Sequence, residues 1–507
     1  MRLPCLFLLL LPLFTAAATP PAHPYADAVR RRIATAQDER KTTDILPFLT
    51  AQNPAYRAAA AEALASVQDR AAVPALLPLL RDAAPAVRRA AAYALGQAGD
   101  STAVPALAQR LTQPEPNALA RRATYEALGR CVTQRSVSQL WIIKPSGPDS
   151  AAAPGRAWGL YRAALRGLAP AEAVGQATKL LGQKGQKLAA RQGASAAFTR
   201  MRGQDSTLAR VALPGLLRLV AGDPDYVVRA NCATALGRVA RPVAYAALLQ
   251  TISTDADHRV RIAALRALPT QKLGSLKGEL HKMVHKSAMS LLAQESVAAA
   301  EWLLRLPVDS TDFADTKNLP IALRFPNWRT RALVLQVALR QMPAARQAAA
   351  RQVVADTIRR RYQRTTNQYE KAALLTALSE DPAQFDFLAK EAALTTGPPV
   401  VPGTALAALV ALRGNKGFLA ARQADFTAAL RRALAGGDEA QLSTAAEALA
   451  DNKLVPAPQP DDLAALRQAR DKLALPREIE PWIALQQALD KLSNAPVPTP
   501  VPRGNAS

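Results

Sequence analysis

The chain has 507 residues with a formal net charge of +24 at pH 7, and it contains only 3 cysteines. So few cysteines in so long a chain exclude a fold held together by disulfides, and the charge favours anionic partners such as acidic proteins, lipopolysaccharide phosphates or nucleic acid. Aromatic residues make up only 5% of the chain, too few to suggest base-stacking surfaces, so we do not expect nucleic acid as the partner.

Residues 1–18 have the features of a secretory signal peptide. Arg2 precedes an unbroken apolar run over 3–14, and the small residues Ala16 and Ala18 stand before the expected cleavage point. Cys5 belongs to this apolar run, and no lipid anchor is indicated. No later stretch approaches the roughly 18 apolar residues that span a bilayer. We therefore expect an exported protein of the periplasm or cell envelope, with an N-terminal cap helix over 19–41.

The chain then repeats itself. Residues 45–69 align without a gap with residues 76–100, so that Pro47 corresponds to Pro78 and Arg57 to Arg88. A period of this size is typical of helical hairpins that cannot bury their apolar faces alone and must stack on a neighbour. The repeat therefore predicts a solenoid, an architecture that mostly binds other molecules.

Each copy predicts two antiparallel helices. In the second copy the first helix carries paired leucines over 76–80, with Pro74 tolerable only in its opening turn. After the break at 82–85, residues 86–97 are rich in alanine and place their apolar positions on one helical face. Gly96 and Gly99 are expected to cap the end of this second helix.

Further copies follow at 104–129, 213–237 and 246–268. Their shared pattern resembles short HEAT repeats, and stands here as Leu79-Leu80-Arg81-Asp82, then Val87-Arg88, then Ala94-Leu95-Gly96. The resemblance implies an all-α fold, an α-solenoid in which stacked helix pairs form a right-handed superhelix.

The resemblance also implies a ladder in which turn acids and second-helix arginines link successive repeats. Carried over to this sequence, the ladder residues are Asp82, Asp223, Asp255, Arg57, Arg88, Arg121, Arg229 and Arg261. The first copy has Ala51 where an acid is expected. We interpret these side chains as structural links between repeats and not as ligand contacts.

The expected organisation is HEAT repeats 1–3 over 42–131, an irregular helical insertion over 132–205, and further HEAT repeats over 206–306. In the insertion, Trp141, Trp158 and Tyr161 are expected to pack against the solenoid. The segment 182–187 (GQKGQK) lacks the spacing of a phosphate-binding loop and predicts a basic turn. Cys131 and Cys232 are expected to be buried free thiols.

Divergent helical repeats are expected over 307–492, followed by a Pro-rich disordered tail at 493–507. The helices predicted in the C-terminal half are 276–285, 289–306, 328–341, 345–364, 369–378, 405–412, 418–434, 440–449, 461–473 and 481–492. His281 and His285 share a helical face, but Lys282 and Lys286 would repel a cation, so we expect two surface histidines. No catalytic, metal or cofactor site is predicted.

The signal peptide is followed by Asp38-Glu39-Arg40, by Leu46-Pro47-Phe48-Leu49 and by Tyr56-Arg57-Ala58-Ala59-Ala60. With these motifs the chain is similar to the N-terminal HEAT region of exported bacterial cyclophilin-type peptidyl-prolyl isomerases. The cyclophilin motif Phe-His-Arg does not occur, and the tail stands where that domain would begin. The sequence thus predicts a non-catalytic envelope scaffold that binds a protein partner or folding client. Alternatives are the N-terminal part of a split or truncated isomerase, a HEAT-like accessory of the phycobilin-lyase type, or a polyanion binder.

Overall fold

The computed structural model describes residues 27–144, 149–183, 185–270, 278, 286–287, 290, 292–305, 323–324, 327–342, 348–395, 397–414, 418, 420–456, 459–473 and 478–493. Over these ranges the ordered elements are helices, and no strand occurs. The chain divides into two compact units, 1–244 and 245–507, and α15 (Pro242–Thr254) contains the point of division. His281 and His285 lie outside the described residues.

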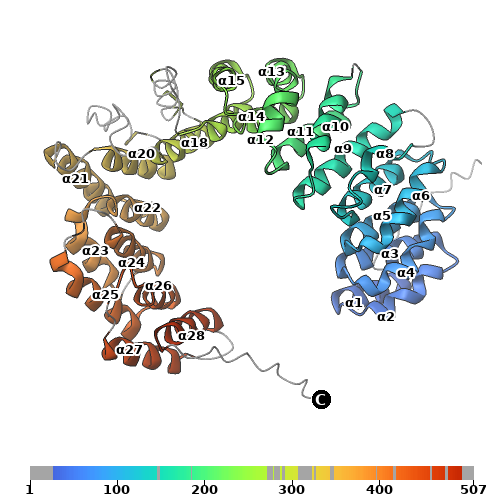
Figure 1. Ribbon diagram of the computed structural model, residues 1–507. Helices are drawn as coiled ribbons and strands as arrows, with labels where there is room; N and C mark the ends of the chain where they lie inside the picture. Colours follow the sequence, from blue (N-terminus) through green and yellow to red (C-terminus); the bar gives the residue numbers. More distant parts are fainter. Residues whose placement is uncertain are drawn as a thin grey trace, which may run out of the picture. The chain divides into compact units, whose positions relative to one another are not determined.

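Unit 1 consists of two rows of helices. One row, the second-helix row, runs α1, α3, α5, α7, α9, α11 and α14, each packed on the next (Figure 1). The other row, the first-helix row, includes α2, α4, α6, α8, α10 and α13, and each of these packs on a member of the second-helix row. The helices of unit 1 are α1 (Ala28–Asp38), α2 (Thr42–Ile45), α3 (Pro54–Val67), α4 (Val73–Leu76), α5 (Pro85–Ala98), α6 (Val104–Thr112), α7 (Ala118–Cys131), α8 (Gln139–Ile142), α9 (Asp149–Leu165), α10 (Ala171–Gly182), α11 (Leu188–Arg200), α12 (Asp205–Thr207), α13 (Leu213–Gly222) and α14 (Tyr226–Leu236).

Unit 2 has the same construction. Its second-helix row runs α16, α18, α20, α22, α24, α26 and α28, and α21, α23, α25 and α27 each pack on a member of that row. The helices are α16 (His258–Ala267), α18 (Ala293–Leu304), α20 (Trp328–Gln341), α21 (Ala348–Arg364), α22 (Gln368–Leu378), α23 (Phe385–Ala392), α24 (Val400–Arg413), α25 (Gln423–Gly436), α26 (Glu439–Leu449), α27 (Pro460–Asp471) and α28 (Ile479–Ser493). The predicted all-α class, an α-solenoid, is confirmed.

Prolines decide the form of the first-helix row. Pro47 and Pro78, at equivalent positions, lack the N–H that an uninterrupted helix needs, and each falls in a 3₁₀ segment, Leu46–Thr50 or Pro78–Arg81. The third copy has Gln109 at this position, and there the first helix is the single helix α6. One residue type therefore determines whether the first helix is continuous.

The ends of the second helices show a related substitution. Gly99 ends α5 in the left-handed region at φ 62°, and Gln68, at the equivalent position of the preceding copy, ends α3 with the same φ. We had expected Gly96 to be a cap as well, but it is not one. It lies inside α5 and is buried, and a Cβ there would come within 2.9 Å of the Cα of Ala127. Its role is close approach between helices.

Residues 132–205, which lack the repeat spacing, contain two helices of the same row. α9 packs on α7, and α11 packs on both α9 and α14. Backbones approach closely here because glycines face each other: a Cβ on Gly129 would lie 2.1 Å from the carbonyl oxygen of Gly159. Trp158 and Tyr161 make an edge-to-face contact on α9, with ring centroids 5.4 Å apart.

In unit 2 the core consists of the facing sides of the two rows. Fully buried side chains include Leu335, Leu374 and Leu409 of the second-helix row and Ile358 and Phe426 of the other. α20 covers the range that we predicted, whereas α23 was not predicted. α24 begins at Val400, before the expected residue 405, and it can include Pro402 because a proline is tolerated in the first turn of a helix. The predicted helix 276–285 lies outside the described residues except for residue 278.

Candidate functional site

The predicted ladder residue Arg57 forms an ion pair with Asp82 of the next repeat. The guanidinium Nε donates to a carboxylate oxygen at 2.7 Å, and Nη1 donates to the carbonyl oxygens of Ala51 and Gln52. The Asp82 side chain is almost completely buried. The hydrogen bond from Arg57 holds the pKa of Asp82 below its ordinary value, although burial alone would raise it. This pair links two repeats.

The next arginine, Arg88, pairs with a glutamate. Its Nε lies 2.7 Å from a carboxylate oxygen of Glu115, to which Arg110 also donates, and its Nη1 donates to the carbonyl oxygen of Asp82. Burial raises the pKa of Glu115, but the hydrogen bonds and charges of its neighbours outweigh this and lower it. Arg121 donates to the Glu115 carbonyl oxygen.

Sequence reasoning missed Glu115, although the signal was present. Glu115 follows Asp82 at the same spacing at which Arg121 follows Arg88. A glutamate therefore occupies the ladder position of the turn acid in the third copy.

The remaining predicted ladder residues lie in the turns of later repeats. Asp223 accepts from Arg191 Nε at 3.0 Å, and Arg229 donates to the carbonyl oxygen of Asp223. In unit 2, Arg261 donates to the carbonyl oxygen of Asp255 at 2.8 Å and forms an ion pair with Glu295 at 2.9 Å.

Two of these partners were not predicted. Arg191 lies in the segment that we had taken as an insertion, and Glu295 is a glutamate in α18. All of these contacts fix turns and neighbouring helices. A separate groove lies on α1, α3, α5 and α7, and none of the ladder residues lines it.

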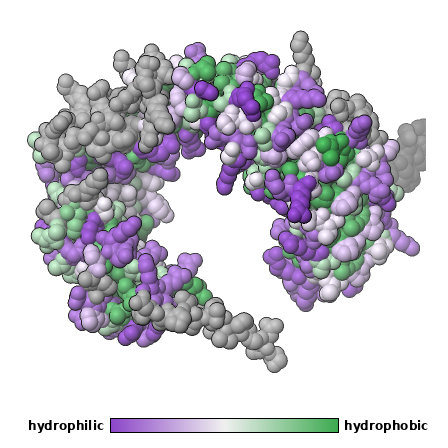
Figure 2. Space-filling view, in the orientation of Figure 1, coloured by the Kyte–Doolittle hydropathy of each residue, from purple (hydrophilic) through white to green (hydrophobic). Residues whose placement is uncertain are grey.

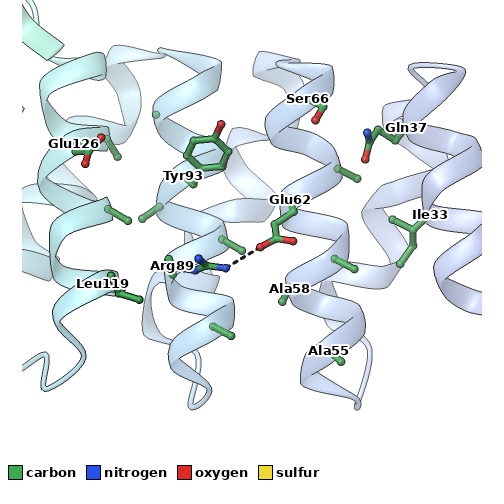
Figure 3. A pocket seen from close by; sticks show the side chains of 18 of the residues that line it. Ile33, Gln37, Ala55, Ala58, Glu62, Ser66, Arg89, Tyr93, Leu119 and Glu126 are labelled. Carbon is green, nitrogen blue, oxygen red and sulfur yellow. Dashed lines mark hydrogen bonds and ion pairs between the residues drawn. The ribbon is translucent and has the colours of Figure 1, made fainter. Parts of the chain in front are cut away.

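That groove lies across the exposed side of these four second-row helices. Its volume is about 940 Å³, and its floor is mostly alanine (Figure 3). The alanines that line it are Ala34, Ala55, Ala58, Ala59, Ala63, Ala86, Ala90, Ala92, Ala123 and Ala127. Small side chains thus leave a hollow where longer ones would fill the surface.

Residues that line the groove recur at equivalent positions of the repeats. Ala59, Ala90 and Ala123 occupy one equivalent position of the three copies, each two positions after a ladder arginine. Arg89 and Arg122 share another position, where the first copy has Ala58. The sequence predicted a binding surface on the solenoid, but these lining residues were not identified, although their regular spacing marks them.

Charged side chains stand along the groove. Arg30, Arg89, Arg122 and Arg130 line it together with only two carboxylates, Glu62 and Glu126. Glu62 and Arg89 reach toward each other between α3 and α5, with an ion pair of 3.1 Å (Figure 3). Both side chains are about half exposed, so this pair contributes little stability.

Glu126 has two arginine partners, whereas Glu62 has one. It accepts from Arg122 at 2.8 Å and from Arg162 of α9 at 3.1 Å. The guanidinium of Arg122 also lies 4.8 Å from the ring centroid of Trp158, which covers that indole with a positive charge. The charged side of the groove thus continues onto α9.

Arg130 has no carboxylate within ion-pair distance in this part of the structure. Its Nη1 donates to the neutral side-chain oxygen of Gln97 at 2.8 Å. Burial lowers the pKa of Arg130, and the neighbouring charge of Arg162 lowers it further. The charge of the nearby Glu126 acts in the opposite direction and raises this pKa, so Arg130 is compensated only in part.

Two large apolar side chains project from the groove. Tyr93 is 49% exposed and Leu119 is 61% exposed, and neither packs into the core. The Tyr93 hydroxyl accepts a hydrogen bond from Gln97 at 2.7 Å. In the space-filling view, hydrophobic (green) and hydrophilic (purple) residues lie side by side on the surface of unit 1 (Figure 2).

The other candidates for chemistry considered among the described residues are groups of metal-binding side chains and the two thiols. No group of three His, Cys, Asp or Glu side chains among them is placed to hold a metal ion. Cys131 and Cys232 are both buried, and burial raises the pKa of the Cys131 thiol to about 12, so it stays protonated. Of segment 182–187, Gly182 ends α10, and the other described residues lie between α10 and α11. Within the described ranges, every helix is too short or too polar to cross a membrane.

Residues 42–129 and 190–269 match the family described as HEAT repeats. The chain therefore carries HEAT repeats in these two segments, and the second begins before residue 206, where we had placed it. The solved structure of the karyopherin Kap121p bound to the SUMO protease Ulp1p is similar, with 14% identity and a TM-score of 0.57 over 91% of this chain and 57% of that chain.

Importin beta is similar too, with 15% identity and a TM-score of 0.54 over 93% of this chain and 64% of that chain. The chain thus spans less than two thirds of either protein, and at these identities the likeness shows the fold alone. No curated protein matches the chain.

Proposed function

We propose that the chain is a scaffold that binds protein partners through the groove of α1, α3, α5 and α7. The observation that carries this proposal is the exposure of Tyr93 and Leu119 over a hollow of about 940 Å³. Large apolar side chains beside a concave surface are typical of interfaces, where they supply most of the binding energy.

The likeness to Kap121p supports the proposal at the level of architecture. That protein, a solenoid of similar fold, is bound to another protein, the SUMO protease Ulp1p. The floor of alanines in unit 1 exposes helices to a partner without intervening long side chains. We propose no catalytic step, so the purified chain should not accelerate the cis–trans isomerisation of a proline peptide.

A photoreactive benzoyl-phenylalanine in place of Tyr93 or Leu119 tests the proposal in the full chain. We expect crosslinks to a polypeptide from both positions, and none from Arg70 or Arg81, which are exposed on the first-helix row. Equal crosslinking from both sets of positions would contradict the assignment of the groove.

The captured partner is then purified and its affinity measured. The half-buried Ala58 and Ala123 lie in the groove, and the Ala58→Trp and Ala123→Trp variants fill it. We expect each variant to weaken binding about tenfold or more while the melting temperature stays near that of the parent chain. Unchanged affinity in both would place the binding surface elsewhere.

We also propose that the chain is exported and acts on folding clients or on a separate folding enzyme in the cell envelope. The support for export is the apolar run over 3–14 after Arg2, followed by Ala16 and Ala18. N-terminal sequencing of the protein recovered from the envelope fraction tests it. A mature chain that starts at residue 19 is expected, and an intact Met1 in the cytoplasmic fraction would refute export.

A further inference from the structure

We infer that the groove takes an acidic polypeptide segment that carries a large apolar side chain. This inference rests on the proposed function and adds the chemistry of the partner. Four arginines and two glutamates line the groove, so its net charge is positive before any partner binds. An incoming carboxylate is attracted, and an incoming lysine or arginine is repelled.

The two glutamates neutralise two of the four arginines, and Arg30 and Arg130 leave the groove with a net positive charge. Glu62 pairs with Arg89, and Glu126 pairs with Arg122 and with Arg162 of α9. Arg130, in contrast, donates to the neutral side-chain amide of Gln97. A partner carboxylate beside Arg130 would gain charge-assisted hydrogen bonds.

The positive charge extends beyond the groove along the same unit. Between residues 151 and 218 the chain has eleven Lys and Arg residues against two Asp and Glu residues. An acidic segment that leaves the groove at α7 therefore continues toward a region that also attracts it.

The apolar requirement comes from Tyr93 and Leu119. Leu119 lies beside Arg122 on α7, and Tyr93 lies one turn beyond Arg89 on α5, so each exposed apolar side chain has a guanidinium near it. A segment that alternates acidic and large apolar residues satisfies both at once. Its apolar side chain is buried against the alanine floor, and its carboxylates stay within reach of the arginines.

The same residues disfavour nucleic acid. A phosphate backbone needs a continuous basic track, whereas Glu62 on α3 and Glu126 on α7 interrupt this one. The ring of Trp158, which could stack on a base, is already covered by Arg122. Discrete carboxylates on a polypeptide can avoid the glutamates, but evenly spaced phosphates cannot.

An array of short synthetic peptides tests the inference. The peptides vary independently in Asp and Glu content, in Lys and Arg content and in large apolar residues, and the array is probed with the full chain at about 0.15 M salt, where distant surface charges are largely screened. Strong binding only to peptides that are both acidic and apolar is expected. Preference for basic or uncharged peptides, or indifference to apolar content, would overturn the inference.

A pair of double variants with the same change in net charge locates the effect. Arg89→Gln with Arg130→Gln removes two charges from the groove, and Arg70→Gln with Arg135→Gln removes two exposed charges outside it. We expect the first to weaken the tightest peptide about tenfold or more and the second by less than about twofold. Equal losses would show a diffuse charge effect and overturn the assignment.

If the first double variant proves unstable, the swap of Glu62→Arg with Arg89→Glu gives an independent test. It keeps the net charge and an exposed ion pair, so acidic peptides should bind within about threefold of the parent, whereas Arg89→Glu alone should lose about tenfold. Full retention of binding by Arg89→Glu would count against the inference.

The failures of the two proposals can be told apart. If the groove positions crosslink to a polypeptide but the array selects basic peptides or none, the scaffold function stands and the acidic partner is wrong. If neither Tyr93 nor Leu119 crosslinks to any polypeptide, the scaffold function itself fails. Displacement of the best peptide by an equimolar oligo-dT of matched length would replace the polypeptide with nucleic acid and overturn the inference.

Discussion

Two neighbouring parts of unit 1 achieve the same helix stacking with different residues. From α3 to α7 the second helices are rich in buried alanines, with Gly96 at one contact between α5 and α7, and the sequence repeats from one copy to the next. From α7 to α11 the repeat pattern is lost, and Gly129, Gly155, Gly159 and Gly193 bring the helices together. Stacking thus depends on small residues at the contact rather than on the recognisable motif.

This comparison explains which parts of the fold the sequence could predict. The first three hairpins were identified because ladder residues, leucines and alanines all recur there at nearly one spacing. Residues 132–205, which contain α9 and α11, were expected to be an irregular helical insertion because the repeat spacing is lost there. The structure shows instead that Gly129 and Gly159 are required by a close backbone approach.

Gly129→Ala has the largest expected effect and tests the glycine contact. A Cβ would lie 2.1 Å from the carbonyl oxygen of Gly159, so α7 and α9 must separate, and we expect a loss of about 3 kcal/mol in the free energy of unfolding. Thermal and denaturant unfolding measure it. Gly175→Ala is the control, because a Cβ there meets nothing within 4 Å and the helix should gain stability. Equal behaviour of the two variants would show that α7 and α9 do not pack as described.

Asp82→Ala tests the ladder in the alanine-packed part. It leaves the largely buried Arg57 without its carboxylate, and we expect a loss of about 2 kcal/mol in the free energy of unfolding. Glu62→Ala, which removes an ion pair with both partners about half exposed, should cost less than about 0.5 kcal/mol. The difference between the two variants, measured by urea unfolding, is the test, and equal losses would contradict the structural role of the ladder.

Acid should destabilise the ladder region. Hydrogen bonds from Arg57 and Arg88 lower the pKa values of Asp82 and Glu115 in the folded chain, so the unfolded chain binds more protons in acid. This stability is therefore complete above pH of about 4.5 and is lost as the pH falls through the folded pKa values. Melting temperatures between pH 7 and pH 3 check it. Asp82→Asn should flatten the decline, and an unchanged slope would contradict the assignment.

The smallest expected effect concerns the two equivalent helix ends. Gln68 ends α3 at φ 62°, and Gly99 ends α5 with the same φ at the equivalent position. Because glycine adopts this φ without strain, Gln68→Gly should raise the free energy of unfolding by about 0.5 to 1 kcal/mol. Gly99→Ala should lower it by about as much. Opposite signs in chemical unfolding support the equivalence of the two copies, and a stabilising Gly99→Ala would contradict it.

The candidate site was less predictable than the fold. The repeat located the ladder arginines, but Glu115 and Glu295 replace the expected aspartates, which a search restricted to Asp could not find. The groove depends on which side of each second helix stays exposed, and one sequence does not distinguish an exposed alanine from a buried one. Tyr93 and Leu119 could have been noticed as large apolar residues at positions where the other copies have Glu or Ala.

Hydroxyl-radical footprinting of the full chain tests the central claim most directly, because the chain contains its own references. Tyr93 is 49% exposed in the groove, Tyr369 is 56% exposed in unit 2, and Tyr125 is fully buried. The partner identified by crosslinking is added at a saturating concentration, without a crosslink. We predict that oxidation of Tyr93 then falls severalfold, that oxidation of Tyr369 is unchanged and that Tyr125 stays unreactive with and without the partner. Oxidation of Tyr93 that is the same with and without the bound partner would contradict the groove as the binding site.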